Sequence, residues 1–348
     1  MKTVLVTGGC GFIGSNFVRF LAAENRYRVI NLDKLTYAGN LENVADIGAE
    51  HRFVKGDIGD RLLIDRLLEE EQPWAVVNFA AESHVDRSIL DALPFVNANI
   101  AGVQVLLEAI RNHPVERFVQ VSTDEVYGDR AGKEPAGEES PLSPSSPYAA
   151  TKAAADLLCL SYRRTYGLPV IITRSSNNYG PYQFPEKLIP LLIRNALNDL
   201  DFPVYGDGRQ IRDWLYVGDN CRAILSVLES GQIGAVYNIG TGEETTNLDV
   251  VESICGFMAE RVGLDLQRLR KRIRSVTDRP GHDRRYALDT SRVRSETGWE
   301  PREVFATGLK NTVGWYLAHQ EWISRVTSGE YRNYYDAVYA QAWGRAEA

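Results

Sequence analysis

Short apolar runs recur along the first half of the chain, and polar or amphipathic stretches separate them. Each run spans four or five residues and is bounded by turn-forming residues, which is typical of buried strands. The stretches between them, such as Asn16–Glu24 and Leu62–Glu70, repeat apolar residues at helical spacing and predict amphipathic helices. The predicted strands are Thr3–Val6, Val29–Leu32, Arg52–Lys55, Ala75–Phe79, Phe118–Val121 and Val170–Thr173.

Strands that alternate with helices at this spacing indicate parallel βαβ units. We therefore predict an α/β protein with a Rossmann-type, doubly wound parallel sheet. The alternation loosens after about Ser175. This change predicts a first, nucleotide-binding domain over residues 1–175, which also carries the catalytic residues, and a smaller α/β substrate-binding domain mainly over 176–348. Some later segments are expected to return to the first domain.

Three further segments have a distinctive composition. The segment from Arg130 to Pro147 is rich in Pro, Ser, Gly and Glu, and it predicts a surface loop. The stretch PVYGDGRQIRDW, residues 203–214, predicts a hairpin or a loop. The dense basic run Leu266–Val276 is interpreted as the solvated face of a helix rather than a site for a polyanion.

Charge and composition narrow the possible functions. The 348 residues carry a net charge of −7, which gives no global electrostatic support for nucleic-acid binding. We find no apolar run near the roughly 18 residues that span a bilayer, and Met1 leads almost directly into the first strand, so we expect neither a membrane segment nor a signal peptide. The four cysteines form no CxxC motif and the five histidines show no metal-ligand spacing. A cytoplasmic protein without a catalytic metal is expected.

A glycine triplet follows the first predicted strand. Gly8, Gly11 and Gly14 lie between this strand and the first helix, where they permit a tight turn and a close approach to a pyrophosphate. Asp33 lies 19 residues beyond Gly14, at the end of the second strand. An acid there accepts hydrogen bonds from ribose hydroxyls and repels a 2′-phosphate, so the pattern favours NAD over NADP. The alternative is a glycine-rich turn without a ligand.

Tyr148 and Lys152 are four residues apart in a helix predicted after Ser146-Pro147, so they share one face. A lysine beside a tyrosine stabilises the phenolate, and a bound nicotinamide cation would lower the phenol pKa further. Such a tyrosine can take the proton of a hydroxyl while NAD takes the hydride. Combined with the glycine triplet and Thr123, the pair is typical of extended short-chain dehydrogenases/reductases.

Two adjacent acids, Asp124 and Glu125, follow the buried strand that ends near Thr123. Side chains alternate along a strand, so both acids can reach one substrate only beyond its carboxyl end, where parallel sheets bind ligands. A carbonyl formed by hydride removal acidifies the neighbouring C–H bond. One acid can then remove that proton while the other, kept protonated, protonates a departing hydroxyl. A capping or salt-bridge pair on a loop is the alternative.

Several long motifs resemble the dTDP-glucose 4,6-dehydratases over nearly the whole chain. They include GGCGFIG, LDKLTYAGNL, FAAESHVDRS, STDEVYGD, SPYAATKA, SSNNYGPYQFPEKLIPL, YGDGRQIRDWLYV, TNLDVV and DRPGHDRRYALD. The resemblance implies that Tyr148 takes the 4-hydroxyl proton as NAD takes the C4 hydride. Glu125 then removes the C5 proton, Asp124 protonates the leaving C6 hydroxyl, and the hydride returns to C6. Thr123 would bond the 4-oxygen, and Lys152 completes the catalytic set.

The resemblance also implies binding residues and an assembly. The expected NAD contacts are Gly8, Gly11, Phe12, Ile13, Gly14, Asp33, Lys34, Leu35, Thr36, Asp57, Ile58, Phe79, Ala80, Ala81, Ser83, Tyr148, Lys152 and Asn178. The expected dTDP-glucose contacts are Ser83, Thr123, Asn177, Lys187, Leu188, Pro203, Val204, Tyr205, Arg212, Asn247, Arg279 and His282. A homodimer is expected through a four-helix bundle formed by the helices at Tyr148 and around Asn99–Arg111.

The chain departs from the family pattern at Ala98, where Thr is usual, and at Cys10, where Ala is common. The loss of the Thr hydroxyl predicts weaker retention of NAD. Alternatives within the fold are the same reaction on UDP-glucose, or a sugar-nucleotide 4-epimerase. Epimerases need no acid–base pair, and related decarboxylases usually have Ser at the Asp124 position. A non-enzymatic NAD-sensing module would have little reason to keep Tyr148, Lys152, Asp124 and Glu125 together.

Overall fold

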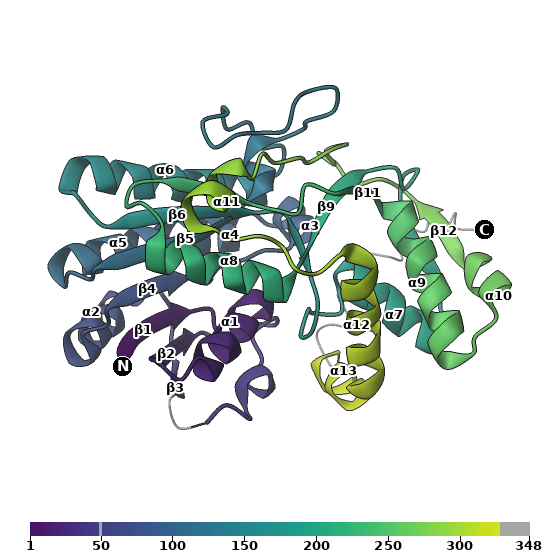
Figure 1. The fold of residues 1–348 in the computed structure, drawn as a ribbon, viewed down its shortest axis with the longest axis horizontal. Coiled ribbons are helices and arrows are strands. Elements are labelled where there is room, and N and C mark those ends of the chain that lie inside the picture. Colours follow the sequence, from purple (N-terminus) through teal and green to yellow (C-terminus); the bar gives the residue numbers. More distant parts are fainter. Residues whose placement is uncertain (49–50, 328–348) are drawn as a thin grey trace.

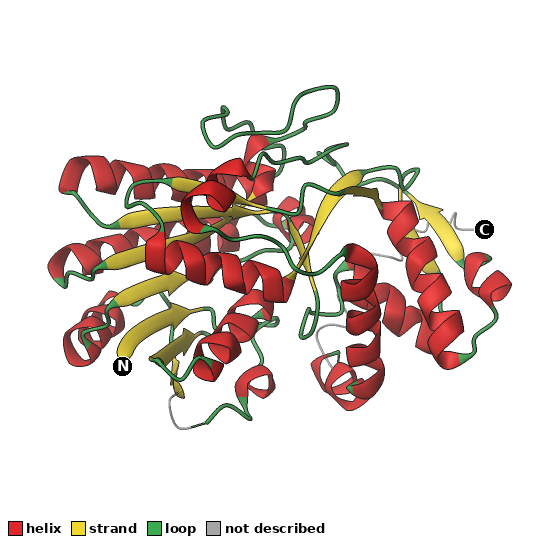
Figure 2. Ribbon diagram, viewed as in Figure 1, coloured by secondary structure: helices red, strands yellow, loops and turns green. Residues whose placement is uncertain are grey.

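The computed structural model describes residues 1–48 and 51–327, and its larger part is built on a seven-stranded parallel sheet (Figures 1 and 2). The strand order is β10-β6-β5-β4-β1-β2-β3. These strands are β1 (Lys2–Thr7), β2 (Tyr27–Asp33), β3 (His51–Lys55), β4 (Ala75–Asn78), β5 (Arg117–Thr123), β6 (Val170–Ser175) and β10 (Val236–Ile239). The six strands predicted from the apolar runs are all present, each within a few residues of its expected ends.

Helices cover both faces of the large sheet, because successive side chains of the strands point to opposite sides. Val4 and Val6 of β1 pack into one core with α1, α8 and α11, whereas Leu5 packs into another with α2, α5 and α6. The bounds of these helices are α1 (Phe12–Ala23), α2 (Arg61–Glu71), α5 (Val103–Asn112), α6 (Pro147–Tyr166), α8 (Val217–Ser230) and α11 (Ser291–Thr297). The predicted Rossmann-type fold is thus confirmed.

The strand order changes direction at β1, and this change creates a crevice where a ligand can bind. β1 pairs with β2 on one side and with β4 on the other, so the strand order reverses there. Ligands of open parallel sheets bind outside the carboxyl ends of the strands at such a reversal. The turn after β1 begins at Gly8, and the acids Asp124 and Glu125 follow β5 at the same edge of the sheet.

A smaller lobe packs beside this edge (Figure 1). It contains a three-stranded sheet, β11-β9-β7, and a two-stranded sheet, β12-β8, with a separate hydrophobic core. Its strands are β7 (Asn177–Tyr179), β8 (Phe202–Tyr205), β9 (Ile211–Tyr216), β11 (Glu244–Thr246) and β12 (Ile273–Val276). Its helices are α7 (Leu188–Leu197), α9 (Asn247–Val262), α10 (Leu266–Arg270), α12 (Phe305–Ala318) and α13 (Gln320–Val326).

Short helical segments complete the described chain. They are η1 (Leu41–Val44), α3 (Val85–Leu90), α4 (Leu93–Val96), the π-helical turn η2 (Asn97–Gly102) and the 3-10 turn η3 (Asp124–Tyr127). α4, η2 and α5 form one continuous helical stretch. By length and composition alone, Leu93–Asn112 could cross a membrane, but 44% of its apolar window is buried inside the protein. Its inner side packs on α2 and α6, as expected for a core helix.

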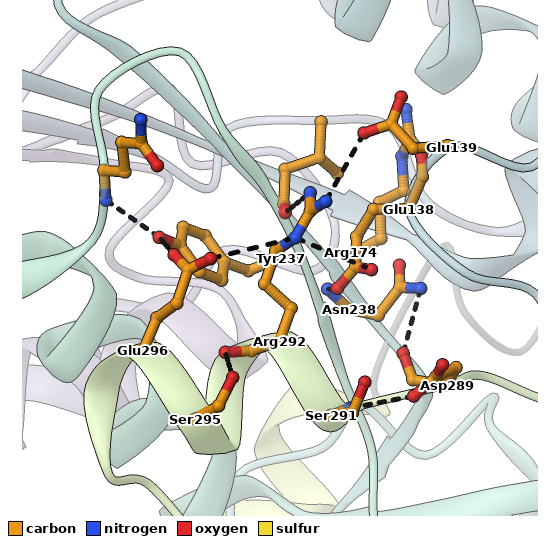
Figure 3. A network of polar contacts seen from close by, with 12 residues as sticks. Glu138, Glu139, Arg174, Tyr237, Asn238, Asp289, Ser291, Arg292, Ser295 and Glu296 are labelled. Atoms are coloured by element: carbon orange, nitrogen blue, oxygen red, sulfur yellow. Dashed lines mark hydrogen bonds and ion pairs between the residues drawn. The ribbon is translucent and has the colours of Figure 1, made fainter.

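The segment between η3 and α6 is a loop, as predicted from Arg130 onwards, but it is not confined to the surface. Ala136 is fully buried, and its backbone bonds to Ala287 and Asp289. The Asn238 side chain of β10 donates to the carbonyls of Ala136, at 2.9 Å, and of Asp289, at 3.2 Å. Figure 3 shows how Arg292 of α11 joins this network through Glu139. The loop is therefore fastened to the large sheet through residues distant in sequence.

The expectation of a hairpin at residues 203–214 is wrong. The stretch does contain two strands, β8 and β9, but β8 pairs with β12 and β9 pairs with β7 and β11. The turn between them carries Gly206 and Gly208, both with positive φ. This turn sends the chain from one small sheet to the other instead of reversing it along a shared ladder.

The basic run Leu266–Val276 is only half helical. Its first part forms α10, and its last four residues form β12. Arg268 and Arg272 pair with Asp199, and Arg270 pairs with Glu252. The run therefore lies on the surface with acidic partners within the chain, which agrees with a solvated role and corrects the helix boundary.

Candidate active site

The turn after β1 needs glycine at two positions. Gly8 has a φ of +70°, and a Cβ on it would lie 2.6 Å from the amide nitrogen of Ala80. A Cβ on Gly14 would lie 2.2 Å from the carbonyl oxygen of Gly8. Glycine therefore allows α1, which begins at Phe12 with Gly11 as its N-cap, to start directly against the strand end. The first amides of this helix supply a site for a pyrophosphate.

Asp33 ends β2 beside this turn and is buried. One carboxylate oxygen accepts the Leu35 amide at 2.7 Å, and the other accepts the Cys10 amide at 2.9 Å. Burial raises the pKa of Asp33, and these two amides oppose the rise. Each oxygen keeps a further lone pair for a ligand, so the carboxylate is oriented as a ribose acceptor requires.

A cavity of about 830 Å³ runs along the carboxyl ends of these strands, within the size range of small-molecule sites. Its lining includes sixteen of the eighteen residues expected to contact NAD; the other two, Leu35 and Asn178, lie outside it. The Asn178 side chain bonds to Ser176 and Asn220 instead. The wall also contains residues that were not among the expected NAD contacts, and among them are Gly39, Gly56, Pro94, Asn97, Ala101, Gly102, Val105, Phe184 and Glu186.

The residues present fit a dinucleotide at three points: a glycine turn that leaves room for a pyrophosphate, a positioned carboxylate for ribose, and a cavity whose lining includes both the glycine turn and the Tyr148–Lys152 pair. Ala98 lines the same cavity on the π-helical turn η2. The departure from the family pattern therefore falls on the cofactor wall.

The five expected catalytic residues lie together at the end of β5. Thr123 is the last residue of the strand, and Asp124 and Glu125 begin η3. Helix α6 starts at Pro147 with the Ser146 hydroxyl as its N-cap, as the sequence predicted. Tyr148 in its first turn is hydrogen-bonded to the Thr123 side chain. One turn later, the Lys152 ammonium donates to the Val121 carbonyl at 2.6 Å.

The two acids have different electrostatic surroundings. Burial, followed by the charge of Glu125, raises the pKa of Asp124 to about 8. Burial also raises the pKa of Glu125, but the guanidinium groups of Arg279 and Arg212 and the ammonium of Lys187 oppose it. One Asp124 oxygen is bonded to Thr123, while the other is buried without a partner among the described residues. The pair can therefore hold one proton on Asp124 and a charge on Glu125.

The protein groups alone do not lower the pKa of Tyr148, contrary to our expectation. Burial raises it, and the charges of Glu125 and Asp124 add to the rise. Burial also lowers the pKa of Lys152 to about 8, and Asp156, one helical turn further, opposes this loss of charge. Asp156 is itself held by Arg174 at 2.8 Å. The charge of Asp156, which Arg174 holds in place, therefore favours the cationic form of Lys152.

The residues expected to contact the sugar nucleotide come from several elements. Arg212 of β9 is buried and donates to the Asp283 carbonyl at 2.9 Å. Arg279 and Tyr205 both bond to Asp86 of α3, at 3.3 Å and 3.0 Å. Asp86 thus joins two predicted contacts; it lies in the motif FAAESHVDRS but was not among the expected site residues. His282 bonds to Asp278 at 2.6 Å, and burial lowers the pKa of this imidazole to about 4.

The remaining predicted contacts lie at element ends in the smaller lobe or beside it. Lys187 precedes α7 and donates to the Ser83 carbonyl at 3.1 Å. Within the described residues, the Asn177 side-chain oxygen and the Arg279 Nε are buried without a partner, as suits groups that face a ligand. The others are Leu188 at the start of α7, Pro203 and Val204 in β8, and Asn247 at the start of α9.

The parallel sheet, the glycine turn with Asp33 and the Tyr148–Lys152 pair define a class. The chain is an NAD-binding protein of the extended short-chain dehydrogenase/reductase type. The model of the family described as GDP-mannose 4,6 dehydratase matches residues 5–312.

Individual relatives indicate the family more narrowly than the family model does. A dTDP-glucose 4,6-dehydratase of Xanthomonas campestris pv. campestris is 52% identical over 344 residues, which cover 95% of this chain and 98% of the relative. The crystal structure of the Streptomyces venezuelae dTDP-glucose 4,6-dehydratase, with NAD and the ligand TYD bound, aligns with a TM-score of 0.87 and 47% identity. That alignment covers 93% of this chain and 99% of the other. The chain belongs to the dTDP-glucose 4,6-dehydratase family.

A protein with the alternative activity, a sugar-nucleotide 4-epimerase, shares the fold at lower sequence identity. The UDP-glucose 4-epimerase of Thermus thermophilus, solved with NAD, aligns with a TM-score of 0.83 and 33% identity over 91% of this chain and 99% of that one. The shared fold does not separate the two activities. Elimination of water needs an acid and a base, and Asp124 and Glu125 after β5 can supply them.

Proposed function

We propose that this protein converts dTDP-D-glucose to dTDP-4-keto-6-deoxy-D-glucose with bound NAD. The observation that carries the proposal is the pair Asp124 and Glu125, whose surroundings favour a proton on one and a charge on the other, beside Tyr148. An epimerase needs only the tyrosine and lysine, whereas elimination of water needs an acid and a base in addition.

Oxidation comes first. When bound, NAD accepts a hydride from C4 and later returns it to C6. Tyr148 takes the proton of the 4-hydroxyl, and Thr123, which is bonded to the tyrosine, orients the same oxygen. Burial disfavours the phenolate, so the charge of Lys152 and the positive nicotinamide must offset it. Asp156 contributes by keeping Lys152 protonated.

Elimination follows at the neighbouring carbons. Glu125, kept charged by Arg279, Arg212 and Lys187, removes the C5 proton that the 4-ketone has acidified. Asp124 then protonates the C6 hydroxyl, which leaves as water. The low-polarity surroundings that raise the pKa of Asp124 to about 8 keep it in its acid form at neutral pH.

A direct assay tests the proposal. The purified protein is incubated with dTDP-glucose and, in parallel, with UDP-glucose, and the product is treated with alkali. A 4-keto-6-deoxy product absorbs after this treatment, and we expect it from dTDP-glucose in preference to UDP-glucose. Formation of the galactose epimer without this absorbance would identify a 4-epimerase instead.

Retention of NAD is expected to depend on Ala98, which lines the cofactor cavity. Ala98→Thr restores a hydroxyl at this wall, and one hydrogen bond of about 0.5–1.5 kcal/mol raises affinity by up to about tenfold. We expect the unmodified protein to purify with less than one NAD per subunit and the variant with more. The nucleotide released on denaturation is quantified by chromatography.

The matched control for this change is Ala98→Val, which has the shape of Thr but no hydroxyl. It should leave the NAD content close to that of the unmodified protein. The role given to Ala98 is wrong if the unmodified protein purifies fully loaded and added NAD does not raise its activity.

The protein is also proposed to form a homodimer through a four-helix bundle of α5 and α6 with their partner copies. Outward apolar side chains support this: Leu157 of α6 is 57% exposed, and Leu93 and Val96 of α4, in the helical stretch that continues into α5, are 63% and 40% exposed. Burial of such residues drives association.

Light scattering at micromolar concentration should therefore give about twice the 39.0 kDa chain mass. Leu157→Glu places a charge in the proposed interface and is expected to shift the mass towards one chain. Leu62→Glu, at a leucine of α2 that is 82% exposed, is the matched control and should remain dimeric. A mass of 39.0 kDa for the unmodified protein would exclude the dimer.

We further infer a cytoplasmic location. The four cysteines are free and buried in the described structure, and none forms a disulfide. This usage is typical of a reducing compartment.

A further inference from the structure

Tyr37 lies on the loop between β2 and η1, only four residues after the ribose-binding candidate Asp33. Its ring meets the edge of Phe184, with centroids 5.7 Å apart, and the Arg87 guanidinium carbon lies 3.8 Å from the ring centroid. Its hydroxyl is hydrogen-bonded to Glu186. A single side chain thus contacts both α3 and the segment that precedes α7.

Glu186 is the acceptor at the centre of this cluster, and only 3% of its side chain is exposed. Arg87 lies 3.3 Å from its carboxylate, and the His84 ring nitrogen lies 3.8 Å away. Burial, with the charges of Lys187, Arg87 and Arg279, holds the pKa of His84 well below its usual range, so the imidazole is neutral. The cations that favour the charge of Glu186 are therefore Lys187 and Arg87, and Arg87 also covers the Tyr37 ring.

The cluster joins two segments that line the cofactor cavity. Thr36 and Ala38, on either side of Tyr37, line the cavity from the ribose loop. Phe184 and Glu186 line it from the segment before α7. The contacts of Tyr37 therefore fasten two cavity walls that come from distant parts of the chain, one in the large sheet domain and one beside the smaller lobe.

The same segment reaches the proposed substrate side. Lys187 follows Glu186 directly and donates to the Ser83 carbonyl, and its ammonium is close enough to Glu125 to favour the charge on that acid. A sugar nucleotide bound against Lys187 would hold this segment in place. Substrate binding and closure of the cofactor cavity thus share residues 183–187.

We propose that Tyr37 is a positioning residue that latches the cofactor cavity: together with Arg87, Phe184 and Glu186, it holds the ribose loop against residues 183–187 and slows the exit of NAD and NADH. The inference rests on the proposed function, because only a reaction that returns the hydride to the same sugar requires the reduced cofactor to stay bound. Loss of NADH after oxidation would leave a ketone that the enzyme cannot reduce.

The test measures cofactor release directly. Protein loaded with radiolabelled NAD is chased with excess unlabelled NAD, with no sugar nucleotide present. Tyr37→Ala should release NAD at least about tenfold faster, since a change that weakens an interface acts mainly on the dissociation rate. Tyr37→Phe keeps the ring packing and removes only the bond to Glu186. Its rate of NAD release should therefore lie between those of the unmodified protein and of Tyr37→Ala. Tyr166→Ala is the matched control: it also removes a ring covered by an arginine, Arg111, and should release NAD at the unmodified rate.

A second arm follows NADH during turnover of dTDP-glucose, with an auxiliary dehydrogenase that consumes only free NADH. Escape should be rare in the unmodified protein and frequent in Tyr37→Ala, while excess NAD restores turnover. Arg87→Gln removes the cation from the same cluster and gives an independent variant if Tyr37→Ala does not fold. Unchanged NAD release in Tyr37→Ala and Arg87→Gln would overturn the latch. Failure of the proposed function would appear separately, as absence of the 4-keto product from the unmodified protein.

Discussion

Replacement of Tyr148 by Phe is expected to remove the oxidation step, with turnover falling by about 10²- to 10⁴-fold, the usual contribution of a positioned general base. The phenol is hydrogen-bonded to Thr123 and stands at the end of the cofactor cavity. Phe keeps the ring and its edge contact with Phe95, so the local packing is preserved. No NADH absorbance should develop when the NAD-loaded variant is mixed with dTDP-glucose.

Tyr27→Phe is the matched control for this change. Its hydroxyl bonds to Glu229 at the opposite end of the sheet, and its loss should leave the rate nearly unchanged. Rapid formation of NADH by Tyr148→Phe would show that another group takes the 4-hydroxyl proton. Arg212 and the other arginines of the site cannot take that proton, because a guanidinium group stays protonated and has no acceptor atom.

The second large effect is expected from Asp124→Asn. The amide cannot protonate the leaving hydroxyl, but it removes neither Tyr148 nor Lys152, so oxidation proceeds and elimination slows by about 10²- to 10⁴-fold. In a single turnover, enzyme-bound NADH should therefore accumulate and decay slowly. If NADH does not build up and the 4-keto-6-deoxy product still forms quickly, then Asp124 is not the acid.

The pH dependence of elimination should follow the same acid. Burial and the neighbouring charge of Glu125 raise the pKa of Asp124 to about 8. Asp124 acts in its protonated form, so elimination should be fully supported below this pKa and lost as the pH rises through it. In Asp124→Asn this basic limb should disappear from the slow elimination rate, whereas the pH dependence of oxidation should remain.

The large sheet could be predicted from the sequence because its signal is local. Strands β1 to β6 each contain a short run rich in apolar residues, and the helices between several of them repeat their apolar residues at helical spacing. Pairing between distant strands leaves no such signal. The addition of β10 beside β6, and the separation of β8 from β9 into different small sheets, depend on contacts between segments far apart in the chain.

The site also has a part that could be predicted from local sequence and a part that could not. The glycine turn, Asp33, the acids after β5 and the Tyr148–Lys152 pair were predictable because each has a fixed place in a strand–turn–helix unit. The role of Asp86, which holds Tyr205 and Arg279, was not predicted, since a motif does not show which distant residues its acid contacts. The raised pKa of Tyr148 also required the structure, because it results from the burial and the distances of three groups.

The proposed reaction requires that the hydride taken from C4 of a sugar returns to C6 of the same sugar within one active site. The most direct measurement uses dTDP-glucose labelled with deuterium at C4, followed by analysis of the product by nuclear magnetic resonance. We predict a 4-keto-6-deoxy product with the deuterium at C6, transferred without dilution by unlabelled NADH in solution. Deuterium retained at C4 of a galactose epimer, or lost from the product altogether, would contradict the account.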